Sequence, residues 1–416
     1  MKKAKPFEIS KHIVMEAFKR VKANQGAAGV DEESILDFEV NLKDNLYKIW
    51  NRMSSGCYFP PPVRTVDIPK KSGGKRVLGI PTVADRVAQM VVKMYLEPYL
   101  EPHFHENSYA YRPERSPIQA VEITRKRCWQ YSWVLEFDIK GLFDNIDHDL
   151  LMKALKMHTD AKWILLYVER WLKAPFKTED GTLVRREKGT PQGGVISPLL
   201  ANLFMHYVFD KWMERSYPQN PFCRYADDAV VHAKTQPEAL MIKEALRERL
   251  KECKLELNPE KTRIIYCKDD NRNGSYPIIS FDFLGFTFRP RKAKNHKGQV
   301  FTSFLPGISN DAAKEIRQEI RSFKIHRRCS ETLESLSEML NPKLRGWINY
   351  YGSFYKTALY PTLNHINRIL TKWVTWKFKR FKGHRRRATH WLGRIAQKQP
   401  TLFAHWQMGV KPAAGR

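Results

Sequence analysis

The stretch Phe222-Cys223-Arg224-Tyr225-Ala226-Asp227-Asp228-Ala229-Val230-Val231 places two neighbouring carboxylates between two runs of aromatic and aliphatic residues. This pattern predicts a tight β-hairpin, because aspartate tolerates the left-handed backbone of a two-residue turn. A turn alone would account for Asp227 and Asp228. A third acid, Asp138, indicates a role beyond a turn. It lies in the apolar segment 133–139, where a charge is costly unless something pairs it.

If the segment 133–139 lies beside this hairpin in one sheet, the carboxylates of Asp138, Asp227 and Asp228 converge. Sites built only from oxygen ligands suit Mg²⁺. Two such ions roughly 4 Å apart form the apparatus of in-line phosphoryl displacement. The sequence therefore predicts that these three acids are catalytic and hold two Mg²⁺ ions, for which Mn²⁺ could substitute.

The charge of the chain indicates a polyanionic partner. Its 416 residues carry a formal net charge of +28, and no acidic residue follows Glu338. Nucleic acid is the usual partner of such a surface. The six cysteines are scattered without a CxxC pair, which argues against a disulfide framework or a zinc site. We find no apolar run long enough for a transmembrane helix and no secretory signal.

The apolar pattern predicts an α+β fold in three parts. Residues 1–60 form a helical extension, residues 61–300 mix hairpins with helices, and residues 301–416 are all-helical. Asp147 and Ser309 are expected to cap helices, and Asn341-Pro342 is expected to start a new one. We expect helices over 13–21, 37–53, 85–99, 150–157, 199–213 and 238–254, a hairpin over 63–80, and strands at 133–139, 262–266 and 281–288.

The chain resembles the reverse transcriptases and maturases encoded by group II introns of the bacterial type. Tyr225-Ala226-Asp227-Asp228 matches the family's YxDD box, and Phe137-Asp138-Ile139-Lys140-Gly141-Leu142-Phe143-Asp144 matches its first acidic motif. The other matches follow in the family's order over roughly residues 20–410: Ile80-Pro81-Thr82, Ser108-Tyr109-Ala110-Tyr111-Arg112-Pro113, the segment 189–202 that begins Gly189-Thr190-Pro191-Gln192-Gly193-Gly194, Phe283-Leu284-Gly285-Phe286, and Arg345-Gly346-Trp347-Ile348-Asn349-Tyr350-Tyr351.

The resemblance implies a right-hand polymerase. Residues 61–300 would form its fingers and palm with an antiparallel sheet, and residues 301–416 its helical thumb, or maturase domain, with a basic C-terminal region. The implied activity is RNA-directed DNA polymerisation, combined with binding of the intron RNA to assist splicing and retrohoming. The implied partners are intron RNA, target DNA with its primer, and deoxynucleoside triphosphates, without a membrane, in a bacterial cytoplasm near the nucleoid. The sequence does not indicate an oligomeric state.

The resemblance also assigns roles around the nucleotide. Lys70 and Arg76 would reach the triphosphate, the Phe143 ring would clash with a ribose 2′-hydroxyl, Gln192 would lie over the templating base pair, and Lys261 could give a proton to pyrophosphate. Each has a plainer alternative: a solvated hairpin tip for the first two, core packing for Phe143, a turn that starts a helix for Gln192, and an exposed turn for Lys261.

Two further groups would contact nucleic acid. Primer and template would meet Phe283, Leu284, Gly285, Tyr225 and Arg112, although the first three could also be an ordinary strand with a packing glycine. RNA would bind a basic run that is interleaved with Trp373, Trp376, Phe378 and Phe381, aromatics we expect in the core. A solvated helix face is the alternative for that run, whose RNA-binding members would be Lys372, Lys377, Lys379, Arg380, Arg385, Arg386 and Arg387.

Some features depart from the family pattern. Glu114 stands where glycine is usual, and Leu142-Phe143 replaces two phenylalanines. No His-Asn-His motif with paired cysteines follows, so we expect no endonuclease. The alternatives are a free-standing reverse transcriptase serving host DNA repair, a maturase that only assists splicing, and, more remotely, an RNA-templated RNA polymerase.

Overall fold

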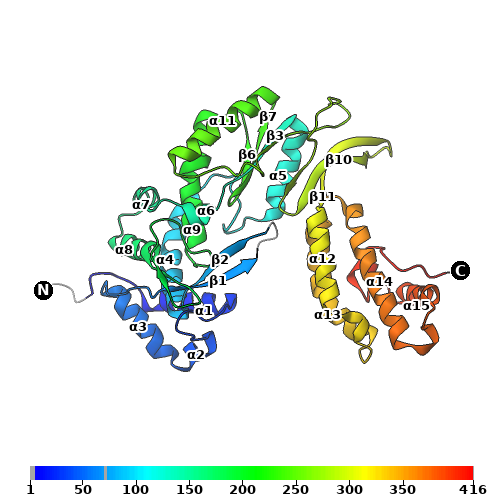
Figure 1. The fold of residues 1–416 in the computed structure, drawn as a ribbon, viewed down its shortest axis with the longest axis horizontal. Coiled ribbons are helices and arrows are strands. Elements are labelled where there is room, and N and C mark those ends of the chain that lie inside the picture. The colour runs from blue at the N-terminus through cyan, green and yellow to red at the C-terminus, as the bar shows by residue number, and fades with distance from the viewer. Residues whose placement is uncertain (1–4, 70–72, 416) are drawn as a thin grey trace. The chain divides into compact units, whose positions relative to one another are not determined.

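The computed structural model describes residues 5–69 and 73–415, which cluster into two compact units. Unit 1 is Met1–Ser116 with Leu135–Arg263, and unit 2 is Pro117–Val134 with Ile264–Arg416. Helices and strands occur in both units (Figure 1), which confirms the α+β fold. No helix of the described residues is both long enough and apolar enough to cross a membrane.

Unit 1 begins with a layer of helices. α1 (Lys11–Asn24) buries Val14, Phe18 and Val21, and it packs against α4 (Val83–Leu100). The expected single helix over 37–53 is instead two, α2 (Ile35–Val40) and α3 (Leu42–Ser54), which meet at Asn41. The side chain of Ser34 caps α2 in a capping box with Asp37, so the chain starts a short helix before the expected one.

Two four-stranded sheets follow along the chain. The first has the strand order β2-β1-β4-β5, and its β1–β2 hairpin confirms the prediction for 63–80. The second has the order β6-β7-β3-β8. Strands β7 and β3 are adjacent in this sheet. Asp138 ends β3, Asp228 begins β7, and Asp227 lies in the turn just before β7. The strands are β1 (Val63–Pro69), β2 (Lys75–Ile80), β3 (Trp133–Asp138), β4 (Phe176–Lys177), β5 (Leu183–Val184), β6 (Phe222–Tyr225), β7 (Asp228–Ala233) and β8 (Arg263–Tyr266).

The helices of unit 1 cover these sheets. Asp147 caps α7 as expected, because its carboxylate accepts from the Leu150 amide at 2.9 Å. The helix expected over 199–213 is interrupted by a π-helical segment, η2, a form that often marks functional sites. The remaining elements are η1 (Glu101–His103), α6 (Leu142–Asn145), α7 (His148–Lys156), α8 (Lys162–Lys173), α9 (Ser197–Met205), η2 (His206–Asp210), α10 (Lys211–Ser216) and α11 (Gln236–Glu252), which packs on β7.

Unit 2 contains α5 (Pro117–Gln130) and a sheet ordered β11-β10-β9. The strand expected over 281–288 is in fact a hairpin, because β9 (Phe281–Phe283) and β10 (Phe286–Lys294) pair antiparallel. The chain reverses at Leu284 and Gly285, whose φ angles are 52° and 78°. β11 (Val300–Ile308) was not expected, and the predicted domain boundary at 300/301 falls inside it.

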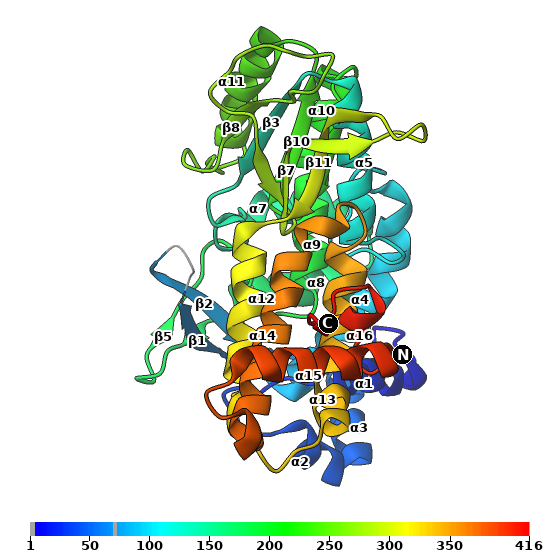
Figure 2. The same ribbon diagram turned by 90° about the vertical axis from the view of Figure 1, so that its right-hand side faces the viewer.

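The rest of unit 2 is helical, as expected. Ser309 caps α12 by accepting from the Ala312 amide. The break predicted at Asn341-Pro342 is absent, because α13 continues through Pro342 while the buried Asn341 amide bonds the Leu402 carbonyl at 2.9 Å. Figure 2 shows α12 and α14 alongside each other with α15 crossing them. The elements are α12 (Asn310–Ser322), η3 (Ile325–Arg327), α13 (Leu333–Tyr351), η4 (Lys356–Ala358), α14 (Tyr360–Lys377), η5 (Lys379–Phe381), α15 (Arg385–Lys398) and α16 (Ala404–Gln407).

Candidate active site

The two neighbouring aspartates lie at the turn of the β6–β7 hairpin, as the sequence predicts. Tyr225 pairs with Asp228, so Ala226 and Asp227 form a two-residue turn. The residue with the left-handed backbone is Ala226, with φ 59°. Neither aspartate is therefore present for its tolerance of that backbone, and the turn alone does not explain the two acids.

Asp138 ends β3, the neighbour of β7, so the sheet brings the three carboxylates to one end. Asp138 is buried, and its Oδ2 accepts from Asn258 Nδ2 and from Lys261 Nζ, each at 3.1 Å. The backbone N–H of Asn258 also donates to the backbone carbonyl of Asp138 at 2.8 Å. The segment that carries Lys261 is thus held against the strand end, and Lys261 is the nearest cation to this carboxylate.

Burial and neighbouring carboxylates raise the pKa values of Asp227 and Asp228. Burial, followed by the charges of Asp227 and Asp138, raises the pKa of Asp228 to about 7. Burial and the Asp138 charge also raise the pKa of Asp227, against the opposing effects of Lys261 and Arg76. Asp228 keeps an exposed surface even though protein atoms crowd around it, so solvent screens part of this repulsion.

No three His, Cys, Asp or Glu side chains are arranged as a ready metal-binding group within residues 5–69 and 73–415. The donor set at the strand ends nevertheless fits a hard divalent cation, because it offers only carboxylate oxygens. Lys261 lowers the pKa values of Asp227 and Asp228, and Arg76 lowers that of Asp227, but burial and the neighbouring acids outweigh these cations. The three acids are therefore the residues here that could hold Mg²⁺ or Mn²⁺.

Two of the predicted nucleotide-binding residues, Arg76 and Lys261, lie close to these acids, and Lys70 falls outside the described residues. Arg76 on β2 is close enough to lower the pKa of Asp227. The Thr190 amide donates to the Phe143 carbonyl at 2.7 Å, and Gln192 Nε2 bonds Asp144 Oδ1 at 3.1 Å. The loop 189–192 is therefore bonded to the segment that presents the half-buried Phe143 ring.

Other predicted contacts are placed differently. Arg112 is turned inward: its guanidinium bonds Glu101 Oε1 at 2.7 and 2.9 Å and the carbonyls of His105 and Ser108 at 2.7 Å. The guanidinium is therefore engaged within the protein, and a contact of Arg112 with primer or template stays a prediction. The sequence reasoning did not single out its neighbour Tyr111, which is half exposed. Burial raises the pKa of Tyr111, and the nearby charge of Asp227 raises it further.

The remaining predicted residues belong to different settings. Tyr225 is half-buried beside the turn. Phe283, Leu284 and Gly285 form the β9–β10 turn of unit 2, where the Tyr350 hydroxyl donates to the Leu284 carbonyl at 2.9 Å. A Cβ on Gly285 would lie 3.1 Å from the Tyr351 hydroxyl, so the close approach of this tyrosine favours glycine there.

The basic run of unit 2 is only partly available to RNA. Lys377 is engaged internally, because its Nζ bonds the carbonyls of Cys329 at 3.0 Å and Glu331 at 2.5 Å. Trp376 is 55% exposed, so the expectation that it belongs to the core was wrong, whereas Trp373 and Phe381 are buried. The exposed members of the predicted run are Lys372, Lys379, Arg380, Arg385, Arg386 and Arg387.

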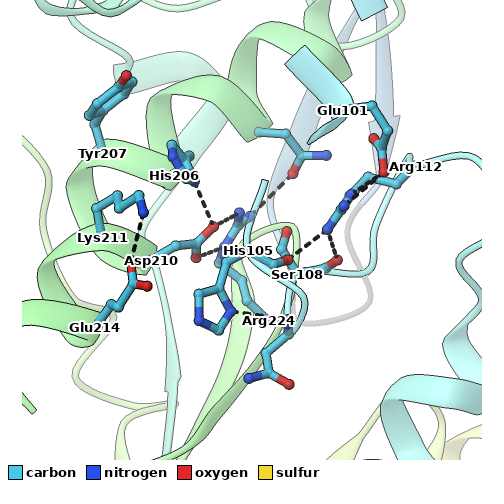
Figure 3. A network of polar contacts seen from close by, with 12 residues as sticks. Glu101, His105, Ser108, Arg112, His206, Tyr207, Asp210, Lys211, Glu214 and Arg224 are labelled. Carbon is cyan, nitrogen blue, oxygen red and sulfur yellow. Dashed lines mark hydrogen bonds and ion pairs between the residues drawn. The ribbon is translucent and has the colours of Figure 1, made fainter. Parts of the chain in front are cut away.

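The sequence reasoning missed a buried network behind the turn that carries Asp227 (Figure 3). Arg224 in β6 and Asp210 in η2 are both fully buried, and their side chains pair through bonds of 2.7 and 2.6 Å. Arg224 Nη1 also donates to the carbonyl of Ala226, the left-handed residue of the turn, at 3.3 Å. Burial lowers the pKa of nearby His206 to about 4, so Asp210 relies on Arg224 for its positive partner.

Two family models match this chain. Residues 68–288 match the model described as reverse transcriptase (RNA-dependent DNA polymerase), and residues 313–391 match the model of the group II intron maturase-specific domain. Protein YkfC of Escherichia coli is 34% identical over 295 residues, which cover 61% of this chain and 77% of that protein.

A second relative covers more of the chain. The group II intron-encoded protein LtrA of Lactococcus lactis is 28% identical over 423 residues, which cover 81% of this chain and 68% of that protein. Among solved structures, telomerase from Candida albicans in complex with a fragment of telomeric RNA matches with a TM-score of 0.45 and 14% identity, over 91% of this chain and 68% of that one.

Proposed function

Because this chain belongs to the reverse transcriptase family of RNA-dependent DNA polymerases and carries the group II intron maturase-specific domain, we propose that it copies intron RNA into DNA and assists the same RNA in splicing and retrohoming. Its partners are then the intron RNA, target DNA with its primer, and deoxynucleoside triphosphates, in a bacterial cytoplasm. Residues 61–300 would serve as fingers and palm and residues 301–416 as thumb and maturase, behind the helical extension 1–60.

The observation that carries this proposal is the convergence of Asp138, Asp227 and Asp228, with raised pKa values at the last two. These side chains would hold two Mg²⁺ ions, and Mn²⁺ could replace them. When bound, the ions supply the positive charge that activates a primer 3′-hydroxyl and stabilises the departing pyrophosphate.

The residues around the acids have distinct tasks in this proposal. Arg76 binds phosphate oxygens of the incoming nucleotide with its guanidinium. Phe143 excludes a ribose 2′-hydroxyl, and Gln192, bonded to Asp144, orients its loop beside the templating pair. Lys261, whose Nζ bonds Asp138 Oδ2 at 3.1 Å, donates a proton toward the pyrophosphate.

Primer extension on an RNA template tests the proposal. The wild-type protein should extend an annealed DNA primer with deoxynucleotides and fail with ribonucleotides alone. Extension with ribonucleotides only would identify an RNA polymerase. Tight binding of intron RNA without any extension would identify a maturase that only assists splicing.

A further inference from the structure

A basic hollow lies in unit 2, within the segment that matches the maturase-specific domain. Its volume is about 730 Å³, and α12, η3, α14 and the start of α15 enclose it. Its floor includes Ile320, Ile325 and Ile369. Its basic lining residues, with no acid among the lining, are Arg321, His326, His365, Arg368, Lys372 and Arg385.

The cations of this hollow are not neutralised by acids of the described part of the chain. Among the described residues, no acid forms an ion pair with Arg321, Arg368, Lys372 or Arg385. His365 Nε2 is shielded from solvent and has no hydrogen-bond partner among the described residues. Burial, followed by the charges of Arg321, Arg368 and Arg317, lowers the pKa of His365. Arg321 and Arg368 next to His365, together with Lys372 and Arg385 in the same lining, form a positively charged site that suits an anion.

An exposed aromatic ring stands beside the same residues. The Trp376 ring is 55% exposed and contacts the His326 ring edge-on at a centroid distance of 5.1 Å. Lys372 Nζ lies 5.5 Å from the centroid of the Trp376 ring. Exposed aromatic rings next to cations bind unpaired nucleotides, whose bases can stack while the phosphates meet the charges.

We propose that this hollow binds an unpaired segment of RNA, with backbone phosphates among Arg321, Arg368, Lys372 and Arg385 and one base stacked on Trp376. The choice of RNA rests on the proposed maturase function. The proposal keeps Lys372 and Arg385 of the predicted basic run, adds Arg321 and Arg368, and leaves Arg386 and Arg387 outside the main RNA contact.

The test measures how tightly the full-length protein binds a labelled RNA that cannot pair with itself. The affinity is compared with that for the blunt-ended duplex of the same RNA. Arg321→Gln/Arg368→Gln should weaken binding of the unpaired RNA and reduce the slope of log affinity against log salt by about 1.4, which is ~0.7 per lost contact. Arg386→Gln/Arg387→Gln removes the same charge outside the hollow and should change the slope by less than half as much. Equal effects of the two double variants would overturn the assignment of the phosphates.

The tryptophan is tested separately. Trp376→Ala should weaken the binding of unpaired RNA by about 5-fold to 150-fold, because a stacked base contributes ~1–3 kcal/mol of binding free energy. The same variant should bind duplex RNA with an affinity within about 2-fold of the wild type. Trp376→Phe should recover most of the affinity for unpaired RNA. Unchanged affinity in Trp376→Ala, or equal losses for unpaired and duplex RNA, would overturn the stacking contact.

Primer extension on a pre-annealed template separates this proposal from the proposed activity. If the wild-type chain does not extend a primer, the polymerase assignment fails while the binding comparison still decides the hollow. If the wild type extends normally and the hollow variants bind RNA like the wild type, only the hollow is refuted. All substituted side chains are exposed at the surface, so thermal unfolding of each variant should match the wild type.

Discussion

Replacing Arg224 by methionine should both destabilise unit 1 and displace the turn that presents Asp227 and Asp228, and these two effects can be separated. Arg224 and Asp210 are each 0% exposed, and two bonds of 2.6 and 2.7 Å join them. Removing one partner of a buried ion pair leaves an uncompensated charge and costs about 3–5 kcal/mol. Arg224→Met should therefore lower the free energy of unfolding by this amount, measured by urea denaturation.

The double variant Arg224→Met/Asp210→Leu distinguishes stability from positioning. Replacing both partners of a buried pair by apolar side chains of similar volume is often neutral. The double variant should therefore regain most of the lost stability. It cannot regain the bond from the guanidinium to the Ala226 carbonyl, which holds the turn that presents Asp227 and Asp228.

Steady-state primer extension then supplies the decisive comparison. A displacement of catalytic groups by about 1 Å can reduce the rate by ~100-fold, so kcat of the double variant should fall on that order while KM for the annealed template changes little. The matched control is Arg272→Met/Asp269→Leu, which removes a largely buried pair of unit 2 and should leave kcat near wild type. Wild-type kcat in the stable Arg224/Asp210 double variant would refute the positioning role.

Three further outcomes are expected. Asp227→Ala should abolish extension while RNA affinity stays within a few fold, measured by extension and by RNA titration, because the basic surface is unchanged. Phe143→Ala should raise incorporation of ribonucleotides relative to deoxynucleotides in competition assays. Asp85 is fully buried, and burial raises its pKa to about 6 despite bonds from Trp171, Tyr58 and Gln89. The pKa of Asp85 in the folded protein exceeds the unfolded value of 3.8, so the stability that its protonated form contributes is fully present below pH ~4 and is lost as pH rises through 6. The loss amounts to about 3 kcal/mol in the free energy of unfolding. Urea denaturation of Asp85→Asn, measured as a function of pH, should not show this loss.

Each of these outcomes has a clear contrary result. Substantial extension by Asp227→Ala would mean that the catalytic acids are misassigned. An unchanged sugar preference in an active Phe143→Ala variant would show that the ring only packs. A stability profile of Asp85→Asn that parallels the wild type between pH 4 and 6 would show that another group titrates there.

The three acids could be predicted because their signal is local. An acid in an apolar strand and two acids at a hairpin are visible in sequence, and sheet adjacency then brings them together. The Arg224–Asp210 pair has no such signal at Asp210, since a π-helical segment changes the phase of the helix that presents it. The available hint was Arg224 itself, a charge within an otherwise apolar strand.

The β9–β10 turn was missed for a different reason. Residues 281–288 have the β-branched and aromatic composition of one continuous strand, and only Gly285 interrupts it. A glycine inside a strand pattern often marks a bend or a close approach of other atoms. Both conditions hold here, because Gly285 has a positive φ and the Tyr351 hydroxyl lies against it. The approaching tyrosine belongs to a segment far along the chain, which local patterning cannot anticipate.

The basic run of unit 2 shows why net charge overstates the number of nucleic-acid contacts. Lys377 uses its ammonium on two carbonyls, and Arg380 lies 4.8 Å from the centre of the Phe381 ring. By contrast, Lys372 and Arg385 face a hollow that holds no acid. Only charges that meet phosphate release counterions, at about 0.7 log units each on a single strand. The salt dependence of RNA binding should therefore report the few cations of the hollow and not the full basic excess of the chain.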